Sequence, residues 1–347
     1  MIDEPLSRGK VARLSRPRRQ PTRRRRSRRF RGPDLHCIDI GLINNMPDPA
    51  LGATERQFRA LLEAAAGDLD VRLTLYTLPE VPRTAFGCQQ VARYAEFRSL
   101  WDSSHDGLII TGTEPLADDL KDEPFWDSLT RVLEWSERNT HSTVLSCLAA
   151  HAGILHLDGI RRVPLGNKRF GVFECVRVCD HPLTSAAPGT LQMPHSRWNE
   201  IPEEALLACG YRVLTRSAAA GVDAFIKQRR SLFVFFQGHP EYDAITLLLE
   251  YRRDIGRYLR GERDTYPTMP HGYLDEQTVE SLTLLRERAL ADRRAELLAE
   301  FPLSVAASRV AHTWRATAEH LYRNWLRYIH SEKKQAANRR AAAADRG

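Results

Sequence analysis

Short apolar and β-branched runs alternate along this 347-residue chain with longer segments in which apolar side chains recur at helical spacing. The short runs predict strands over residues 37–43, 71–76, 107–111, 143–145, 171–178 and 231–236. The longer segments predict helices over residues 53–66, 125–138, 244–259, 276–300 and 310–329. Thr54 is expected to cap the first helix, and residues 156–200 are otherwise expected to be rich in loops. Strands that alternate with helices predict an α/β fold with a mainly parallel central sheet flanked by helices.

The net charge of +7 is carried by the N-terminus. Residues 1–33 contain thirteen Lys and Arg against two acidic residues, so the rest of the chain has a net charge of −4. A self-repelling segment without apolar periodicity predicts a disordered basic extension over residues 1–33. Such an arm can bind nucleic acid through phosphate contacts, and an Arg-rich N-terminus can also be a transit peptide. Because nothing downstream resembles a nucleic-acid module, we expect a dispensable extension, one folded domain over residues 34–330 and a disordered tail over 331–347.

The composition is that of a globular protein, with 42% hydrophobic residues to form a core. No run approaches the roughly 20 apolar residues of a membrane-spanning helix. The six cysteines show no close pairs at metal-site spacing, and no secretory apolar segment opens the sequence. We therefore expect a cytoplasmic protein that is not attached to a membrane.

Cys147 occupies a position that suits a nucleophile. It follows the short apolar run 143–145, and the small and helix-forming residues that begin with Leu148 come directly after it. A cysteine at a strand-to-helix turn lies in the positive field of the helix N-terminus, which favours the reactive thiolate. The alternative is a small buried apolar side chain, which is the common fate of a free cysteine.

His239 and Glu241 are the natural partners of this cysteine. They follow the predicted strand 231–236, as residues 111–114 follow another strand, and polar loops at strand C-termini are where function collects in α/β sheets. Histidine suits a general base near neutral pH, and Glu241 can orient its ring if the backbone curls back. The order Cys, His, Glu resembles that of class I glutamine amidotransferase-like domains, which implies their flavodoxin-like core.

A more selective resemblance covers roughly residues 37–328. The segments that carry it are residues 45–47 (Asn-Met-Pro) with 54–55, 106–112 (Asp-Gly-Leu-Ile-Ile-Thr-Gly), 126 with 132–136, 142–143 with Cys147, 194–197 (Pro-His-Ser-Arg), 238–243 (Gly-His-Pro-Glu-Tyr-Asp), 314–315 and 324–326. In these segments the chain resembles the homoserine O-acyltransferases (homoserine O-succinyltransferase or transsuccinylase) of methionine biosynthesis.

This resemblance implies a ping-pong acyl transfer without a bound cofactor, in which acyl-CoA is a co-substrate. Cys147 would carry the acyl group as a thioester, His239 would be the general base, and Glu241 would orient it. Backbone N–H groups of Gly112 and Leu148 could hold the oxyanion. The partners implied are small molecules, acyl-CoA and L-homoserine, together with a second copy of the chain in a homodimer.

Three further residues match substrate-binding positions of the family: Lys168, Ser196 and Arg253. A guanidinium suits the carboxylate of an amino acid, which it can bind with two hydrogen bonds. Without the resemblance, Arg253 beside Arg252 would be interpreted as a solvated helix face. His151 lies four residues after Cys147, but no further ligands match it, so we expect a packed histidine and no metal site.

The acyl donor is left open between succinyl-CoA and acetyl-CoA. The family position that separates the two donors aligns with Leu116, and a shifted alignment brings Glu114 there instead. The acceptor could also be serine rather than homoserine. An amidase of the same fold, and a nucleic-acid-associated protein that acts through residues 1–33, are the other functions considered.

Deletion of residues 1–33 distinguishes the enzyme from the nucleic-acid-binding protein. The enzyme hypothesis predicts that steady-state acyl transfer by the shortened chain stays within about twofold of the full-length rate, because the predicted catalytic residues all follow residue 111. Loss of turnover, together with loss of affinity for nucleic acid, would contradict the interpretation of this segment as dispensable.

Overall fold

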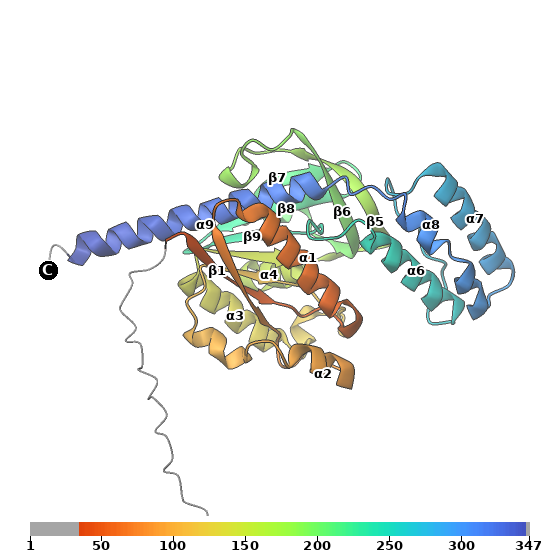
Figure 1. Ribbon diagram of the computed structural model, residues 1–347, viewed down its shortest axis with the longest axis horizontal. Coiled ribbons are helices and arrows are strands. Elements are labelled where there is room, and N and C mark those ends of the chain that lie inside the picture. Colours follow the sequence, from red (N-terminus) through yellow and green to blue (C-terminus); the bar gives the residue numbers. More distant parts are fainter. Residues whose placement is uncertain (1–34, 345–347) are drawn as a thin grey trace, which may run out of the picture. The chain divides into compact units, whose positions relative to one another are not determined.

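Strands and helices alternate along residues 35–344, which are the part of the chain that the computed structural model describes (Figure 1). The predicted disorder of residues 1–33 falls outside this range. The strands are β1 (Cys37–Ile43), β2 (Asp70–Tyr76), β3 (Gly107–Ile110), β4 (Ser142–Ser146), β5 (Val163–Arg177), β6 (Thr190–Glu200), β7 (Arg212–Ser217), β8 (Gly221–Gln228) and β9 (Leu232–Phe236). The helices are α1 (Asp48–Ala66), α2 (Ala85–Val91), α3 (Trp126–Asn139), α4 (Leu148–Asp158), α5 (Glu203–Ala208), α6 (Thr246–Leu259), α7 (Glu276–Ala291), α8 (Leu303–Ala307) and α9 (Arg315–Ala344).

All of these strands belong to one sheet with the order β2-β1-β3-β4-β9-β8-β7-β5-β6. The half from β2 to β9 is parallel, and every residue of β3, β4 and β9 is buried, as expected where helices cover both faces. This confirms the predicted α/β fold. The other half, from β9 to β6, is antiparallel, and of its strands only β9 and the second half of β5 were predicted. Its strands β5 and β6 occupy most of the region that we expected to be loops.

Successive side chains of the central strands point to opposite faces of the sheet, and each face has its own hydrophobic core. Ile109, Val144 and Val234 face the side on which α1 and α9 pack, whereas Leu145 and Phe235 face α3 and α4 on the opposite side. Figure 1 shows α9 running beside α1 across the sheet. Burial of both faces fixes the register of β3, β4 and β9, because a slip of one residue would exchange their two sets of side chains.

A third core lies at the outer part of the sheet, where α6, α7 and α8 pack together (Figure 1). Tyr251 of α6, Leu282 of α7 and Phe170 of β5 are buried in it. The fully buried Trp314 joins this core to the segment after β9, because its indole N–H donates to the carbonyl of Tyr242 at 2.9 Å. The helical region thereby supports the loop that carries His239.

The boundaries of three predicted helices were wrong. Helix α1 begins at Asp48, before the predicted start, because a proline close after its N-terminus suits the first turn, so Thr54 lies inside the helix instead of capping it. The predicted helix over residues 276–300 ends at Ala291 and continues as a separate 3₁₀ turn. The last helix begins at Arg315 and continues to Ala344, so the predicted disordered tail is helical over residues 331–344.

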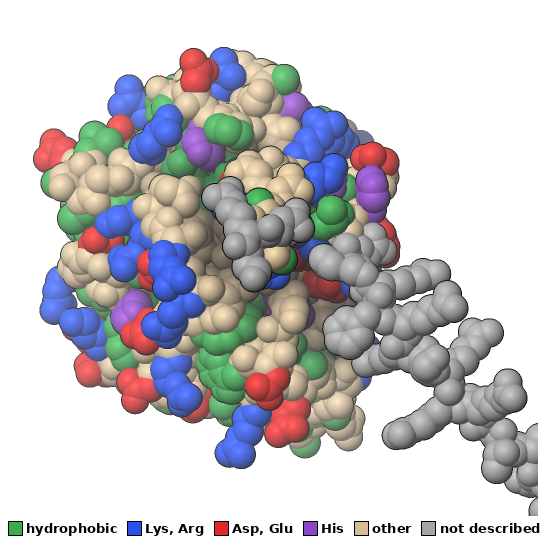
Figure 2. Space-filling view, turned by 90° about the vertical axis from the view of Figure 1, so that its left-hand side faces the viewer, with side chains coloured by type: hydrophobic (Ala, Val, Ile, Leu, Met, Phe, Trp, Pro, Cys, Tyr) green, Lys and Arg blue, Asp and Glu red, His purple; other side chains and the backbone are tan. Residues whose placement is uncertain are grey.

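On the face that Figure 2 shows, Lys and Arg side chains are interspersed with Asp and Glu. Across residues 35–344, no helix has both the length and the apolar composition needed to cross a membrane.

The helical extension beyond residue 330 is expected to stabilise the fold through Lys333. Its ammonium donates to the buried Asp106 carboxylate and to the Cys37 carbonyl, both at 2.7 Å. Lys333→Met should lower the free energy of unfolding by about 1–3 kcal/mol, because it removes the partner of a buried carboxylate. Lys334→Met alters an exposed neighbour and should stay within about 0.5 kcal/mol. Equal effects in urea titrations of the two variants would contradict a structural role for this segment.

Candidate active site

The carboxyl ends of three neighbouring strands meet at one edge of the sheet. β3, β4 and β9 are adjacent and parallel, and they lead into Gly112, Cys147 and His239 respectively. Parallel pairing alone therefore brings Cys147 and His239, which lie 92 positions apart in the sequence, to the same edge of the sheet.

Cys147 occupies a strained turn between β4 and α4. Its φ of 53° and ψ of −114° lie outside the regions that side chains with a Cβ ordinarily adopt. The backbone N–H donates to the Phe236 carbonyl at 2.8 Å, which holds the turn in place. Cys147 is partly exposed and lies at the N-terminus of α4, where the positive field of the helix favours an anion. Strain of this kind is typical of residues whose side chain must be presented to a ligand.

His239 is buried and bridges Cys147 and Glu241. Its Nδ1 lies 2.9 Å from Oε1 of Glu241, and since a carboxylate can only accept, Nδ1 carries the proton and Nε2 remains for Cys147. Burial would lower the pKa of His239, but the charges of Glu241 and Cys147 and the hydrogen bonds with both raise it well above its ordinary value. Its backbone N–H donates to the Pro194 carbonyl at 2.8 Å, and its ring stacks on Tyr242 at 4.2 Å. The backbone therefore curls back as predicted, which lets Glu241 orient the imidazole.

Gly112 approaches the first turn of α4 very closely. A Cβ at this position would lie 2.8 Å from Cβ of Leu148 and 2.9 Å from its backbone N, so only glycine permits the contact. The backbone of both predicted oxyanion residues thus lies beside Cys147.

The predicted substrate-binding residues converge on two acids that the sequence analysis missed. Ser196 donates to Oε2 of Glu250 at 2.5 Å, and Nζ of Lys168 lies 3.3 Å from the same oxygen and 2.8 Å from Oδ2 of Asp254. Arg253, half exposed, pairs with Asp254 at 2.9 Å and with Glu250 at 3.7 Å. Glu250 lies one turn before Arg253 on a predicted helix, but this spacing is common on solvated helices and so gave no distinct signal.

The loop that carries the predicted donor-specificity residues lies beside α6. Glu114 forms a two-pronged ion pair with Arg257, at 3.1 and 3.2 Å. Leu116 is 67% exposed, and its backbone N–H donates to the buried Glu123 carboxylate at 2.7 Å. The charge of Glu114 is therefore compensated, and the apolar Leu116 side chain is free to meet a ligand.

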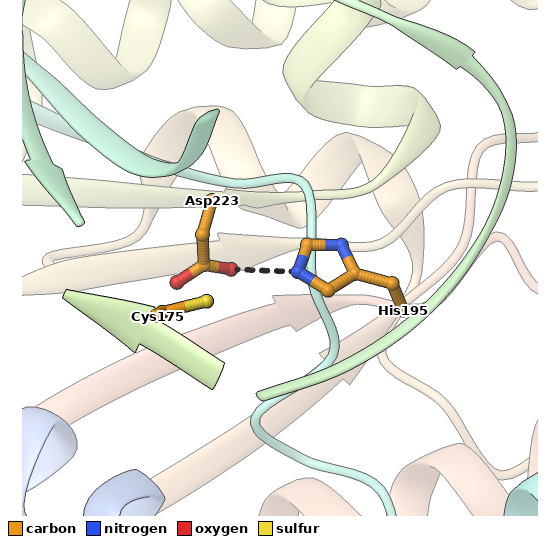
Figure 3. Close-up of side chains that lie close together, drawn as sticks. All are labelled: Cys175, His195 and Asp223. Carbon is orange, nitrogen blue, oxygen red and sulfur yellow. Dashed lines mark ion pairs between the residues drawn. The ribbon is translucent and has the colours of Figure 1, made fainter. Parts of the chain in front are cut away.

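A buried cluster beneath the site has the side chains of a metal centre. Cys175, His195 and Asp223 come from β5, β6 and β8, and Figure 3 shows them pointing toward one another. Their potential ligand atoms all lie within 4.8 Å of one another. Burial, together with the Asp223 charge, raises the pKa of the Cys175 thiol, which disfavours the thiolate that a metal requires.

Hydrogen bonding around His195 also disfavours a metal. Nε of Arg197 donates to Nδ1 of His195 at 3.5 Å, so the ring proton lies on Nε2 and faces Oδ1 of Asp223 at 3.4 Å. If a metal were bound to Nε2, the ring proton would have to lie on Nδ1, where it would face the N–H of Arg197 and two donors would oppose each other. Thr215 donates to the second Asp223 oxygen at 2.7 Å. The cluster is thus better described as a buried His195–Asp223 pair beneath the His239 loop, in which Thr215 supports the carboxylate.

His151 is not part of a metal pair with Cys147. It is buried inside α4, and its Nε2 lies 3.2 Å from the Gln237 side-chain oxygen. Burial, followed by the charge of Arg197, lowers the pKa of His151 to about 3. It is accordingly a neutral packing residue that ties α4 to the end of β9.

Comparison with known proteins agrees with this geometry. A model of the family described as homoserine O-succinyltransferase matches residues 17–336. A homoserine O-succinyltransferase of Rhodopseudomonas palustris is 47% identical over 307 residues, which cover 87% of this chain and 92% of that protein. This chain belongs to the homoserine O-succinyltransferase family.

A second relative in this family, from Methylorubrum extorquens, is 45% identical over 306 residues, covering 88% of this chain and 91% of that protein. Among solved structures, a glutamine amidotransferase from Thermotoga maritima aligns with a TM-score of 0.46 at 13% identity, covering 84% of this chain and 98% of its own. The family model and the two relatives confirm the family membership expected from residues 37–328.

Folding stability should depend on pH through His239. The pKa of His239 is raised in the folded protein above its ordinary value of about 6.5. Protonation of His239 therefore stabilises the folded state fully below about pH 6.5, and this stabilisation is lost as pH rises through the higher pKa of the folded protein. Glu241→Gln removes the largest charge that raises this pKa. In urea titrations, this substitution should therefore lower the free energy of unfolding more at about pH 6 than at about pH 9.

The matched control is Glu204→Gln, which alters an exposed glutamate. It should have the same small effect at both pH values. A Glu241→Gln effect that does not change with pH would show that Glu241 does not hold a proton on His239.

Proposed function

We propose that this protein transfers a succinyl group from succinyl-CoA to the hydroxyl of L-homoserine, through a thioester on Cys147, in methionine biosynthesis. The observation that carries the proposal is the strained Cys147 turn, hydrogen-bonded to the strand that leads into the His239–Glu241 pair. Membership of the homoserine O-succinyltransferase family supports both substrates.

In the first half-reaction the Cys147 sulfur attacks the acyl carbonyl of succinyl-CoA, and its proton passes to Nε2 of His239. Backbone N–H groups near Gly112 and Leu148 stabilise the oxyanion that forms. The carbon–sulfur bond to CoA then breaks, and His239 returns the proton to the departing thiol. The products of this step are free CoA and an acylated Cys147.

In the second half-reaction homoserine takes the place of CoA. Its hydroxyl gives a proton to His239 while the oxygen attacks the thioester carbonyl. The Cys147 sulfur leaves and recovers the proton, and O-succinylhomoserine is released. Glu241 keeps the imidazole in one tautomer and offsets its charge in both halves.

The donor assignment is supported by the loop over residues 112–123. Because Arg257 neutralises Glu114, this acid does not repel the free carboxylate of a succinyl group. Leu116 is exposed on the same loop and would contact the donor.

We further infer a cytoplasmic homodimer. All six cysteines are free, which suits a reducing compartment. Three large apolar side chains on α7 and α8, Leu284, Leu290 and Val305, are more than half exposed and would suit contact with a second copy.

Incubation with succinyl-CoA in the absence of homoserine tests the covalent route. Intact-mass measurement should show one succinyl adduct per chain, located on the peptide that contains Cys147. Added L-homoserine should remove it, with formation of O-succinylhomoserine.

Cys147→Ala should give no adduct, whereas substitution of the partly exposed Cys179 should leave the adduct unchanged. An adduct of equal yield in Cys147→Ala, or turnover by that variant within tenfold of the unmodified rate, would contradict a thioester at this residue.

A further inference from the structure

Two arginines face each other across the antiparallel pair of β5 and β6. Arg169 is the register partner of Arg197, so the two side chains lie on the same face of the sheet. Like charges in directly opposite positions destabilise a sheet. This pair therefore costs stability unless an anion lies between its two positive groups.

The two faces of β6 differ in how their charges are balanced. Ser196 points toward α6, where two cations are paired with two acids. His195 and Arg197 point the other way, because successive side chains of a strand alternate. Within residues 35–344, neither Arg169 nor Arg197 forms an ion pair with a carboxylate. The positive charge on this face is thus available to a ligand.

Arg197 keeps hydrogen-bonding capacity although it is only 3% exposed. It donates from Nη1 to the Asn199 carbonyl at 2.7 Å and from Nη2 to the Ala220 carbonyl. With the bond from Nε to His195, these contacts leave two of the five N–H groups of the guanidinium for another acceptor. On the opposite strand, Nε of Arg169 is buried and has no hydrogen-bond partner among the described residues. An anion here would supply acceptors that both side chains lack.

A third arginine, Arg162, is attached to the loop that we expect to contact the acyl donor. Its Nη2 donates to the carbonyl of Asp118, two residues after Leu116 on that loop, at 3.4 Å. Arg162 is half-buried and forms no ion pair in the part of the chain that the structure describes. Its exposed neighbour Arg161, by contrast, pairs with Asp119 at 3.1 Å. Of these two adjacent arginines, Arg162 is therefore the one that can bind a ligand.

Arg162 and Arg197 both lie close to Cys147. Burial lowers the pKa of Arg197 to about 10, and among the surrounding charges the opposing effect of Cys147 is the largest. Burial also lowers the pKa of Arg162, against the charges of Glu123 and Cys147. Both arginines act in addition on the pKa of His151, one turn after Cys147 on α4. Since charges interact more strongly at short distance, the two guanidinium groups lie near the first turn of this helix.

The position of β6 determines which anion can reach these arginines. Pro194 of this strand accepts a hydrogen bond from the backbone N–H of His239 at 2.8 Å, so β6 lies against the loop that follows β9. An acyl group on Cys147 would lie beside the same strand. In a succinyl group, two methylene groups separate the free carboxylate from the thioester carbonyl, so the carboxylate must be bound within about 5 Å of that carbonyl. A carboxylate can also accept from two arginines at once, through its two oxygens.

We propose that Arg197, together with Arg162 and Arg169, binds the free carboxylate of the succinyl group that Cys147 receives. This inference rests on the proposed function, because it names the residues that recognise the charged end of the acyl donor. No partner for this carboxylate was predicted from the sequence.

Butanoyl-CoA tests the proposal on the unmodified protein, because a methyl group replaces the carboxylate in an acyl chain of the same length. Acylation of Cys147 can be followed by intact mass in the absence of homoserine. Its rate constant should be at least about 100-fold larger with succinyl-CoA, since butanoyl leaves the buried guanidinium groups without a partner.

Substitution of the arginines should reduce this preference. Arg162→Gln and Arg169→Gln should each slow acylation by succinyl-CoA at least about tenfold, and Arg197→Gln at least about 30-fold, because the carboxylate loses a charged partner. Acylation by butanoyl-CoA should stay within about threefold in all three variants. A merely structural role would slow both donors and preserve their ratio. Because Arg197 is buried, the two half-buried arginines decide the outcome if Arg197→Gln does not fold.

The matched control is Arg161→Gln, which removes an exposed positive charge next to Arg162. It should change acylation by either donor by no more than about twofold. A general effect of positive charge on the polyanionic CoA would instead slow acylation equally in Arg161→Gln and Arg162→Gln, with both donors, and would contradict a carboxylate subsite.

Two further results would overturn the proposal. One is acylation of the unmodified protein by butanoyl-CoA as fast as by succinyl-CoA, and the other is an unchanged preference in Arg162→Gln and Arg169→Gln. Failure of the unmodified protein to form any adduct with succinyl-CoA would instead contradict the proposed function, so the two failures are distinguishable.

Discussion

The arrangement of the site depends on one backbone hydrogen bond, which the N–H of Cys147 donates to the carbonyl of Phe236. It continues the pairing of β4 with β9 beyond the last residue of β4, and so ties Cys147 to the strand that ends three residues before His239. Because both strands are buried on both faces, neither can slide without exposing its apolar side chains. The fold therefore supports the strained turn at Cys147 by means of the whole central sheet.

Charges are arranged differently in the two parts of the site. Around His239, Glu241 and Cys147 raise the pKa of one imidazole, which suits proton transfer. Around Glu250, two cations and two acids balance one another. Tyr242 connects the two parts, since it stacks on His239 and donates to Glu250. The two groups of charges are thereby coupled through a single side chain.

Much of the parallel half of the sheet could be predicted from sequence, because β3, β4 and β9 are continuous apolar runs bounded by polar turns. The position of Cys147, and its pairing with His239 and Glu241, followed from strand order and from residue chemistry. The first half of β5 and all of β6 were missed since their burial is irregular and charged residues interrupt them, whereas the second half of β5 overlaps the strand predicted over residues 171–178. Glu250 and Asp254 could not be recognised because their role arises from the packing of α6 against β5 and β6, which local sequence does not encode. Lys333 is a similar case, since its partner Asp106 lies 227 positions away.

The central claim is that succinyl transfer to Cys147 is complete before the acceptor takes part. Isotope exchange tests this most directly: labelled CoA is incubated with the protein and unlabelled succinyl-CoA, with no homoserine present, and label is followed into succinyl-CoA. The account predicts exchange that is abolished in Cys147→Ala and His239→Ala. Exchange that requires homoserine would mean that both substrates must be bound together, and it would contradict the thioester route.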